Sequence, residues 1–289
     1  MATNVEQTYQ ERILNVLVYI QNHLDNELTL EELSAVACFS PFHFHRVFTA
    51  HTSESFKSYI RRLRLERAAR DLAFSNLSIN EITERAAFDT HQSFHRAFKD
   101  MFHETPATFR EKAFEKIFPA RTKKTSSLLT KPVEIKTIDP ITVAFMRRIG
   151  PYSETHILEI WFKLVAQIGI TTFLSDKVMR IGIPHDTIDI TPSEKIRYDA
   201  CISIDHLPNF KAKGDVGTQT IPGGQYAVIR HEGSFDKIEA TYEMLFSDWM
   251  PNSGYEPADY PSFMVHRNMP LQMAADALIT DIYLPIRAL

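Results

Sequence analysis

SPFHFHRVF at residues 40–48 and THQSFHRAF at residues 90–98 are two versions of one motif. The second version repeats the first at an offset of 50 residues: Phe44, His45, Arg46 and Phe48 return as Phe94, His95, Arg96 and Phe98. In each version two phenylalanines stand four residues apart, so they share one side of a helix and predict that this side faces a core. A unit that occurs only twice indicates a duplicated module and not a solenoid.

Signals for the start of a helix precede and open both versions of the motif. Thr29–Glu32 and Ser78–Glu81 have the form of a capping box, in which a hydroxyl accepts from a backbone N–H and the glutamate reaches back. Ser40 and Thr90 are N-cap residues of a second helix, and Pro41 suits its first position. Two short helices joined by a tight turn, present twice, predict two helix-turn-helix units in tandem.

Residues 56–74, FKSYIRRLRLERAARDLAF, separate the two units. They contain neither proline nor glycine, so they are predicted to form one helix that links the units rigidly. One face of this helix is basic, and we expect Arg61, Arg62 and Arg64 to contact DNA phosphates together with Lys99 of the second motif.

The side of each motif helix opposite the phenylalanines is expected to read bases in the major groove. Its residues are Phe42, His45, Arg46 and Thr49 in the first version, and His91, Gln92, His95 and Arg96 in the second. Arginine can reach O6 and N7 of guanine together, glutamine can pair with adenine, and an aromatic edge can pack on a thymine methyl group. The alternative for Arg46 and Arg96 is a salt bridge that braces each module.

The second half of the chain alternates strand-like and helix-like segments. Segments rich in β-branched and aromatic residues predict strands at 141–149, 198–204, 226–232 and 279–286, and helices are predicted at 153–169 and 235–250. A second repeat has an offset of 83: Ala144, Arg147 and Gly150 match Ala227, Arg230 and Gly233. This repeat predicts a duplicated strand-helix-strand unit and an α+β domain.

A polar, basic and proline-flanked stretch, PARTKKTSSLLTKP, reads as a linker between the halves. The predicted organisation is an all-α tandem helix-turn-helix domain at residues 6–113, a linker at 114–131 and the α+β domain at 132–289.

Composition excludes several classes of protein. No apolar run approaches the roughly 18 residues of a membrane span, and the first residues lack the pattern of a secretory signal. The two cysteines are too few for a disulfide framework, so we expect a cytoplasmic protein. His91 and His95 have the spacing of a helical metal pair, but no third ligand pattern accompanies them. We therefore expect neither a metal nor a cofactor.

Net charge alone argues against nucleic acid, because the formal value is −4. The distribution weakens the objection: residues 1–124 carry 17 Lys+Arg against 16 Asp+Glu, and residues 125–289 carry 15 against 20. A local basic face can bind phosphates on a chain that is acidic overall.

FSPFHFHRVF and FDTHQSFHRAFKDMFHETPATFRE resemble the AraC/XylS family of transcription regulators, and the second stretch is close to that family's signature. A DNA-binding domain followed by an effector-like domain resembles the Rob-type arrangement, in which the C-terminal domain has the GyrI-like ligand-binding fold. IPGGQYAVIRHEGSFDKI, the segment Trp249–Pro251 and ITDIYLPI are similar to that fold. The resemblance implies a transcription activator whose two modules enter adjacent major grooves, with the eight base-reading residues given above.

The chain departs from the family at four turns, where Cys38, Ser53, Ala87 and His103 replace the usual glycine. Glycine suits turns that need a positive φ. We therefore expect these turns to be either adjusted or mildly strained, without loss of the fold.

A further departure concerns the C-terminal domain. Met264 stands where cation-binding members carry a glutamate, and His266 where tyrosine is common. A buried carboxylate attracts cations and a methionine does not, so the resemblance implies a neutral or anionic apolar effector. The expected pocket residues are Trp161, Tyr198, Phe263, Met264 and His266. The alternative is that Trp161 and Phe263 are core residues.

Three roles for the C-terminal domain stay open. It binds a small effector, or it is a ligand-free module that contacts a protein such as RNA polymerase, or it is a hydrolase. The last role is disfavoured because the domain has no nucleophile elbow and no metal-ligand cluster, and because Met264 replaces the acidic residue. We expect a non-enzymatic protein that binds double-stranded DNA, as a monomer or as a dimer.

Overall fold

The computed structural model describes residues 4–117, 132–207, 210–212, 214–268 and 273–289. The chain divides into two compact units, one N-terminal and one C-terminal, with the main boundary between residues 119 and 120. The predicted linker, residues 114–131, lies outside the described residues apart from 114–117, which belong to a helix. Among the helices of the described ranges, none combines the length and apolarity of a membrane span.

In its described part the N-terminal unit is helical throughout, as the capping signals and the absence of strand patterns predict. Its helices are α1 (Asn4–Asn22), α2 (Leu30–Val36), α3 (Pro41–Thr52), α4 (Phe56–Phe74), α5 (Ile79–Arg85), α6 (His91–Phe102) and α7 (Pro106–Ile117). Both predicted capping boxes are formed: Thr29 Oγ1 accepts from the backbone N–H of Glu32, and Ser78 Oγ accepts from that of Glu81.

The two helix-turn-helix units have matching cores. Phe44 and Phe48 of α3 are fully buried, and the Phe48 ring meets the edge of Tyr59 on α4 at 5.6 Å between ring centroids. In the second unit Phe98 of α6 meets Phe109 of α7 in the same way at 5.4 Å. The repeat in the sequence is therefore a repeat in the packing.

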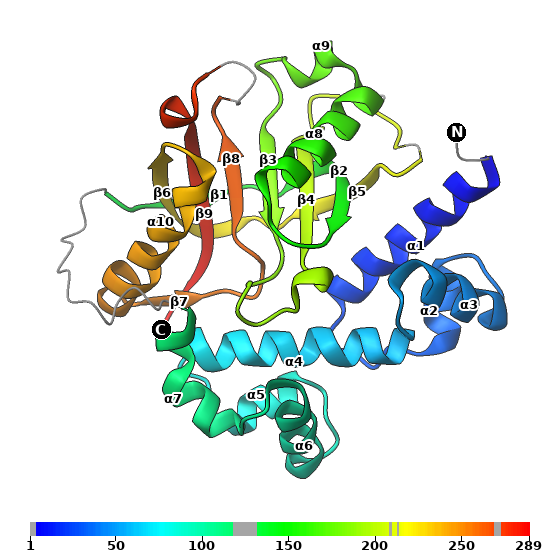
Figure 1. The fold of residues 1–289 in the computed structure, drawn as a ribbon, viewed down its shortest axis with the longest axis vertical. Helices are drawn as coiled ribbons and strands as arrows, with labels where there is room; N and C mark the ends of the chain where they lie inside the picture. The colour runs from blue at the N-terminus through cyan, green and yellow to red at the C-terminus, as the bar shows by residue number, and fades with distance from the viewer. Residues whose placement is uncertain (1–3, 118–131, 208–209, 213, 269–272) are drawn as a thin grey trace. The chain divides into compact units, whose positions relative to one another are not determined.

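Helix α4 belongs to the cores of both units. Tyr59, Ile60 and Leu63 in its first half are buried in the cluster of the first unit, whereas Ala69 and Leu72 in its second half are also buried, where α4 packs against α5, α6 and α7. Figure 1 shows α4 as one uninterrupted helix, in cyan, that runs from the first helix-turn-helix module to the second. The prediction of a single linking helix is confirmed.

Four turns of this unit hold non-glycine residues in the left-handed region. The φ angles are 51° at Cys38, 59° at Ser53, 49° at Ala87 and 61° at His103. These are the four turns that the sequence analysis expects to be adjusted or mildly strained, and they occur at equivalent points: after α2 and α5, and at the C-caps of α3 and α6. The turns keep the glycine geometry, so the substitutions cost strain and do not change the path of the chain.

The C-terminal unit is built on one curled, mostly antiparallel sheet. Its strands are β1 (Glu134–Ile138), β2 (Ile141–Ile149), β3 (Arg180–Pro184), β4 (Arg197–Ser203), β5 (Gly217–Ile221), β6 (Gly224–Glu232), β7 (Tyr255–Pro257), β8 (Phe263–His266) and β9 (Ile279–Ala288). The order across the sheet is β1-β6-β9-β8-β3-β4-β2-β5, with β7 paired to β9. Its helices are α8 (Glu154–Ile168), α9 (Ile170–Phe173) and α10 (Ile238–Met244).

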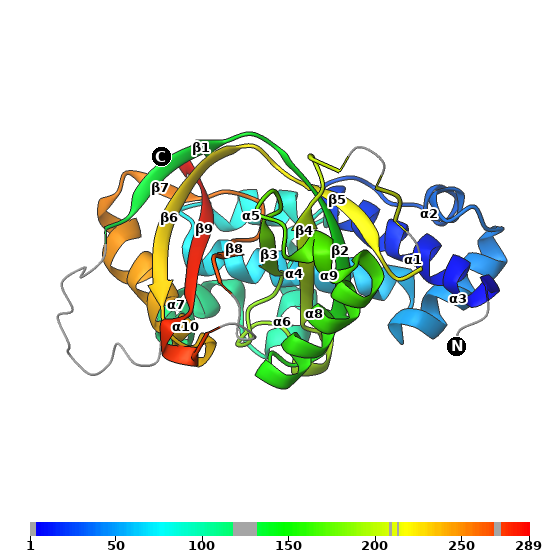
Figure 2. The ribbon, with the colours of Figure 1, turned by 90° about the horizontal axis from the view of Figure 1, so that it is seen from above.

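Helices α8 and α10 cover the same face of the sheet (Figure 2). Trp161 of α8 bonds to Tyr198 of β4, and Thr241 of α10 bonds to His231 of β6. The strand registers place Tyr198 and His231 on one face, because residues paired across antiparallel strands share a face. The predicted helix at 235–250 is shorter than expected: after Met244 the chain forms a π-helical turn, and Pro251, which lacks an N–H, follows at its end.

The predicted duplication of the C-terminal unit is visible in its hydrogen bonds. The N–H of Gly150 donates to Ile196 at 2.8 Å, and the N–H of Gly233, its counterpart, donates to Leu278 at 2.9 Å. The two glycines have positive φ angles of 130° and 116°. In each half a strand that ends near the glycine pairs with a strand that begins after its acceptor, β2 with β4 and β6 with β9.

Candidate functional site

The exposed side of α3 carries the predicted base-reading residues of the first module. Phe42 is 79% exposed, which is unusual for a large apolar side chain, and His45 and Arg46 are exposed beside it. Thr49 is half-buried, and its hydroxyl is enclosed by protein without a hydrogen-bond partner. Three of the four predicted residues are therefore exposed to solvent, whereas Thr49 is partly covered by the protein.

The corresponding side of α6 carries those of the second module. His91, Gln92, Arg96 and Lys99 are exposed, and His95 is half-buried with its ring centroid 6.0 Å from that of Phe94. His91 Nδ1 lies 3.5 Å from Thr83 Oγ1 of α5, so the first turn of α6 is tied to the preceding helix. Polar, exposed tips on a helix fixed by a buried side are the arrangement that major-groove reading requires.

Arg46 and Arg96 are exposed in the described chain, and neither guanidinium has an ion pair or a hydrogen bond to any other part of it. The described residues therefore give no support to a bracing role for the two arginines and leave both donors available to a ligand.

The arginines of α4 divide into exposed and engaged residues. Arg61 is exposed. Arg62, in contrast, pairs with Glu54 at 2.6 Å and Glu66 at 3.2 Å, and Arg64 donates to the carbonyl oxygens of Leu24 and Asn26 at 2.9 and 2.6 Å. The side chain of Arg62 is only 12% exposed.

A phosphate contact by Arg62 would therefore have to compete with two carboxylates. The sequence shows a basic helix face, but it does not reveal that Glu54, eight residues away and across a turn, meets this guanidinium.

The described residues contain no group of three or more histidine, cysteine, aspartate or glutamate side chains placed to hold a metal ion. The rings of His91 and His95 lie 6.2 Å apart between centroids, on the exposed side of α6.

Three of the predicted effector residues, Trp161, Tyr198 and His266, meet where α8 crosses the central strands. Trp161 Nε1 donates to Tyr198 Oη at 3.2 Å, and the Trp161 ring lies 5.6 Å from the His266 ring. Phe235 reaches the same imidazole from the α10 side at 5.2 Å. Tyr198, Trp161 and His266 are each less than 5% exposed, so they form one enclosed aromatic group.

His266 is the unusual member of this group. Its Nδ1 lies 3.2 Å from Thr280 Oγ1, but its Nε2 is buried without a hydrogen-bond partner. Burial, with the nearby Arg180 charge, lowers the pKa of His266 to about 4, so the imidazole is neutral at physiological pH.

Gly182 of β3 makes room for these polar atoms. A Cβ at residue 182 would lie 2.4 Å from Tyr198 Oη and 3.1 Å from His266 Nε2. Any larger residue there would displace the tyrosine hydroxyl, so glycine lets a hydroxyl and an unpaired imidazole nitrogen converge over β3.

Met264 shares this face with Gly182, which it opposes in the β3–β8 register. Phe263 does not: it precedes Met264 on the strand, lies on the other face and stacks on Tyr283 at 4.7 Å between centroids. The prediction that groups Phe263 with Met264 and His266 is corrected, because neighbouring residues of a strand point to opposite faces. Phe263 is fully buried, in agreement with the alternative of a core role.

The opposite face holds a charged network that the sequence did not indicate. Arg147 of β2 grips Asp199 of β4 with two hydrogen bonds of 2.7 and 2.8 Å, and His185 and Gln219 donate to the same carboxylate at 2.7 and 2.8 Å. Burial alone would raise the pKa of the Asp199 carboxyl, but the charges of Arg147 and His185 outweigh it and hold that pKa below its ordinary value.

In the other half of the duplicated domain, the counterpart of this pair is Arg230–Asp281, with the atoms 2.7 Å apart. The arginine of that pair is 54% exposed, whereas Arg147 is 2% exposed. The only signal of the network in the sequence is the repeat of Arg147 at Arg230.

Comparison with known proteins gives matches for both units. Residues 131–287 match the GyrI-like small molecule binding domain, and residues 33–112 match a helix-turn-helix domain. The chain is 23% identical over 248 residues to the right origin-binding protein of Escherichia coli K12, which covers 83% of this chain and 84% of that protein.

Two further relatives match less than half of the chain. An uncharacterized HTH-type transcriptional regulator, YbfP of Bacillus subtilis, is 33% identical over 126 residues, covering 44% of this chain and 41% of that protein. The HTH-type transcriptional activator AarP of Providencia stuartii is 32% identical over 103 residues, covering 35% of this chain and 76% of that protein. The match thus spans less than half the length of YbfP.

Proposed function

The chain belongs to the GyrI-like family and is a DNA-binding transcription regulator of the AraC type, and on this basis we propose that it activates transcription by setting α3 and α6 into successive major grooves. One observation carries the proposal: two equivalent helices, joined by the continuous α4, each display an exposed arginine that has no partner within the described chain. An activating role is supported by the relative AarP, whose name describes an activator.

The eight residues that we propose as base contacts are those of the sequence analysis: Phe42, His45, Arg46, Thr49, His91, Gln92, His95 and Arg96. Bidentate contacts from Arg46 and Arg96 to guanine would supply most of the base discrimination, at about 1–3 kcal/mol each. Phe42, which is exposed at the start of α3, is suited to pack on a thymine methyl group.

Selection of bound sequences from a random duplex pool tests this function. We expect enrichment of two short half-sites whose centres lie about one helical turn, roughly 10 base pairs, apart. A pool that shows no enrichment after several rounds would contradict the proposal. Enrichment of a single half-site would restrict the function to one module.

We also propose that the C-terminal unit binds a neutral or anionic apolar effector at the face that contains Met264 and His266. On β3, β4 and β8 this face carries no carboxylate, and Arg180 is its cation. A lipophilic cation there would be repelled by the Arg180 charge, with which Asp176 is the carboxylate that interacts, whereas an anion would meet the Tyr198 hydroxyl and the Arg180 guanidinium.

A pair of probes of nearly equal size and opposite charge tests the effector class. Tetraphenylborate is expected to raise the melting temperature of the C-terminal unit, and tetraphenylphosphonium is not. The Met264→Glu variant restores a carboxylate and should reverse this preference. Stabilisation of the wild-type protein by the cation would contradict the proposal. If no apolar probe of any charge has an effect, the alternative of a protein-contact module, with RNA polymerase as a candidate partner, is favoured.

A further inference from the structure

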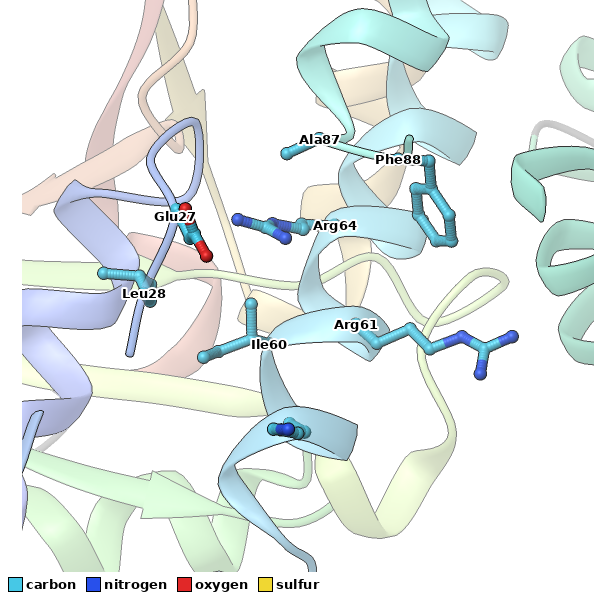
Figure 3. A pocket seen from close by; sticks show the side chains of 8 residues that line it. Glu27, Leu28, Ile60, Arg61, Arg64, Ala87 and Phe88 are labelled. Atoms are coloured by element: carbon cyan, nitrogen blue, oxygen red, sulfur yellow. The ribbon is translucent and has the colours of Figure 1, made fainter. Parts of the chain in front are cut away.

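A pocket of about 260 Å³ lies on α4, between the two helix-turn-helix modules. Its floor is one face of α4, where Lys57, Arg61 and Arg64 follow at helical spacing. Glu27, from the segment before α2, lines one side, and Phe88, from the turn before α6, lines the other (Figure 3). The pocket is therefore composed of parts from both modules.

The lining is positively charged. Three cations face one carboxylate, and within the described chain neither Lys57 nor Arg61 has an ion pair or hydrogen bond. Arg64 is fixed in place by the uncharged carbonyl oxygens of Leu24 and Asn26, while the nearby Asp25, which pairs with Arg67, also interacts with the Arg64 charge. A pocket with one fixed cation and two adjustable ones is suited to a small anion with several acceptor oxygens.

The residues on two sides of the pocket directly precede helices α2 and α6 of the two modules. Leu28 adjoins Thr29, the N-cap of α2, and Phe88 lies three residues before His91, the first residue of α6. In a helix-turn-helix protein the first helix, here α2, crosses the DNA backbone, and the N-terminal residues of the second, here α6, contact base edges. An anion in this pocket would thus sit between two half-sites that are about one turn apart.

We infer that this pocket binds one backbone phosphate of the DNA segment between the two major grooves, with Lys57 and Arg61 as its ligands. The inference rests on the proposed DNA-binding function and adds a specific site to it. Lys57 is a new member of the interface, Arg62 is outside it because it pairs with Glu54 and Glu66, and Arg64 contributes by its charge.

Glu27 allows a test in which a substitution should strengthen DNA binding instead of weakening it. Its carboxylate lines the pocket and repels a bound phosphate, so its neutralisation should tighten DNA binding. Glu111, exposed on α7, is a matched control.

The first experiment measures the affinity of the full chain for its selected duplex as a function of salt. Because Lys57 and Arg61 bind the same phosphate, the Lys57→Ala/Arg61→Ala double variant should make the slope of log K against log salt shallower by about 0.9, and each single variant by no more than that, with base preference unchanged. Glu27→Gln should raise the affinity, and Glu111→Gln and Lys163→Ala should leave affinity and slope unchanged. Because Lys57 and Arg61 are exposed, their variants are expected to melt at the wild-type temperature.

The second experiment locates the phosphate. A single methylphosphonate, which removes one backbone charge, is placed in turn at each position between the two half-sites. In the wild-type protein one position should weaken binding most, and the Lys57→Ala/Arg61→Ala double variant should lose that sensitivity.

Slopes equal to the wild type, or sensitivity confined to phosphates outside the central segment, would overturn the inference while the DNA-binding function stands. Absence of any sequence preference in the parent protein would overturn the function itself.

Discussion

Arg46 and Arg96 occupy the same place on two helices, the sixth residue of α3 and the sixth residue of α6, and both guanidinium groups are exposed. The buried sides of the two helices repeat in the same register, Phe44 with Phe94 and Phe48 with Phe98. Whatever base one arginine reaches in its groove, the other can therefore reach in the next groove with the same geometry.

Replacement of Arg96 by alanine should relax base preference in one half-site only. The loss of a bidentate contact to guanine corresponds to about 1–3 kcal/mol of discrimination at that base pair. Selection with the Arg96→Ala variant should yield a motif that is degenerate at one position of the second half-site, and Arg46→Ala should do the same in the first. An unchanged motif would show that these arginines do not read bases.

Glycine at the four left-handed turns should stabilise the N-terminal unit. A non-glycine residue with φ near 50° costs roughly 1–2 kcal/mol, and histidine tolerates this region better than most residues. We expect Cys38→Gly and Ser53→Gly each to raise the free energy of unfolding by about 1 kcal/mol, and His103→Gly by less. Ala50→Gly within α3 is the control, and calorimetry should find it destabilising.

His266 should make the C-terminal unit sensitive to acid. Its folded pKa of about 4 lies below the ordinary 6.5, so the unfolded chain binds the proton more readily. Its contribution is complete above pH 6.5 and is lost as the pH falls toward 4, to the extent of roughly 3 kcal/mol.

Tryptophan fluorescence follows the unfolding of the C-terminal unit separately from that of the N-terminal unit, because Trp161 and Trp249 both lie in the C-terminal unit. The His266→Gln variant should lose the part of the dependence between pH 6.5 and 4 that His266 supplies, while His185, whose pKa burial also lowers, keeps its own part. His206→Gln, a change at an exposed histidine, should retain it. Equal pH profiles for the two variants would contradict the assignment.

The two counterpart ion pairs of the duplicated domain should differ in their importance for stability. Asp199→Asn would leave Arg147, 2% exposed, without its charge partner, at a cost of about 3–5 kcal/mol. Asp281→Asn would release Arg230 and Arg267, which are 54% and 43% exposed and can be hydrated instead. Chemical unfolding of the two variants compares them, and equal losses would show that burial of the arginine does not decide the cost.

Most of the fold could be predicted because it depends on local patterns and repeats. Capping boxes, the spacing of Phe44 and Phe48, and the unbroken run at 56–74 are local signals, and the offset of 83 disclosed the duplication of the second domain. The positions of the four strained turns were also predicted. Each of these turns needs a positive φ angle, and the chain keeps that angle although the residue is not glycine.

The candidate sites were less predictable because they depend on contacts between distant residues. The sequence shows that Arg62 and Arg64 are on a basic helix, but their partners are a glutamate across a turn and two carbonyl oxygens about 40 residues away. Phe263 and Met264 are adjacent in the chain, and the exact strand register decides which of them faces the helices. The Asp199 network joins residues of four separate segments, and no periodicity announces it.

The continuity of α4 also constrains how such a protein can diverge. Each residue inserted into a helix advances the chain by 1.5 Å and turns everything beyond it by about 100°. A single insertion between Leu63 and Ala69 would therefore rotate the second recognition helix, α6, to another side of the duplex. Regulators built on this plan can acquire new operators by exchanging side chains, but the interval between the halves of the operator is written into the length of one helix.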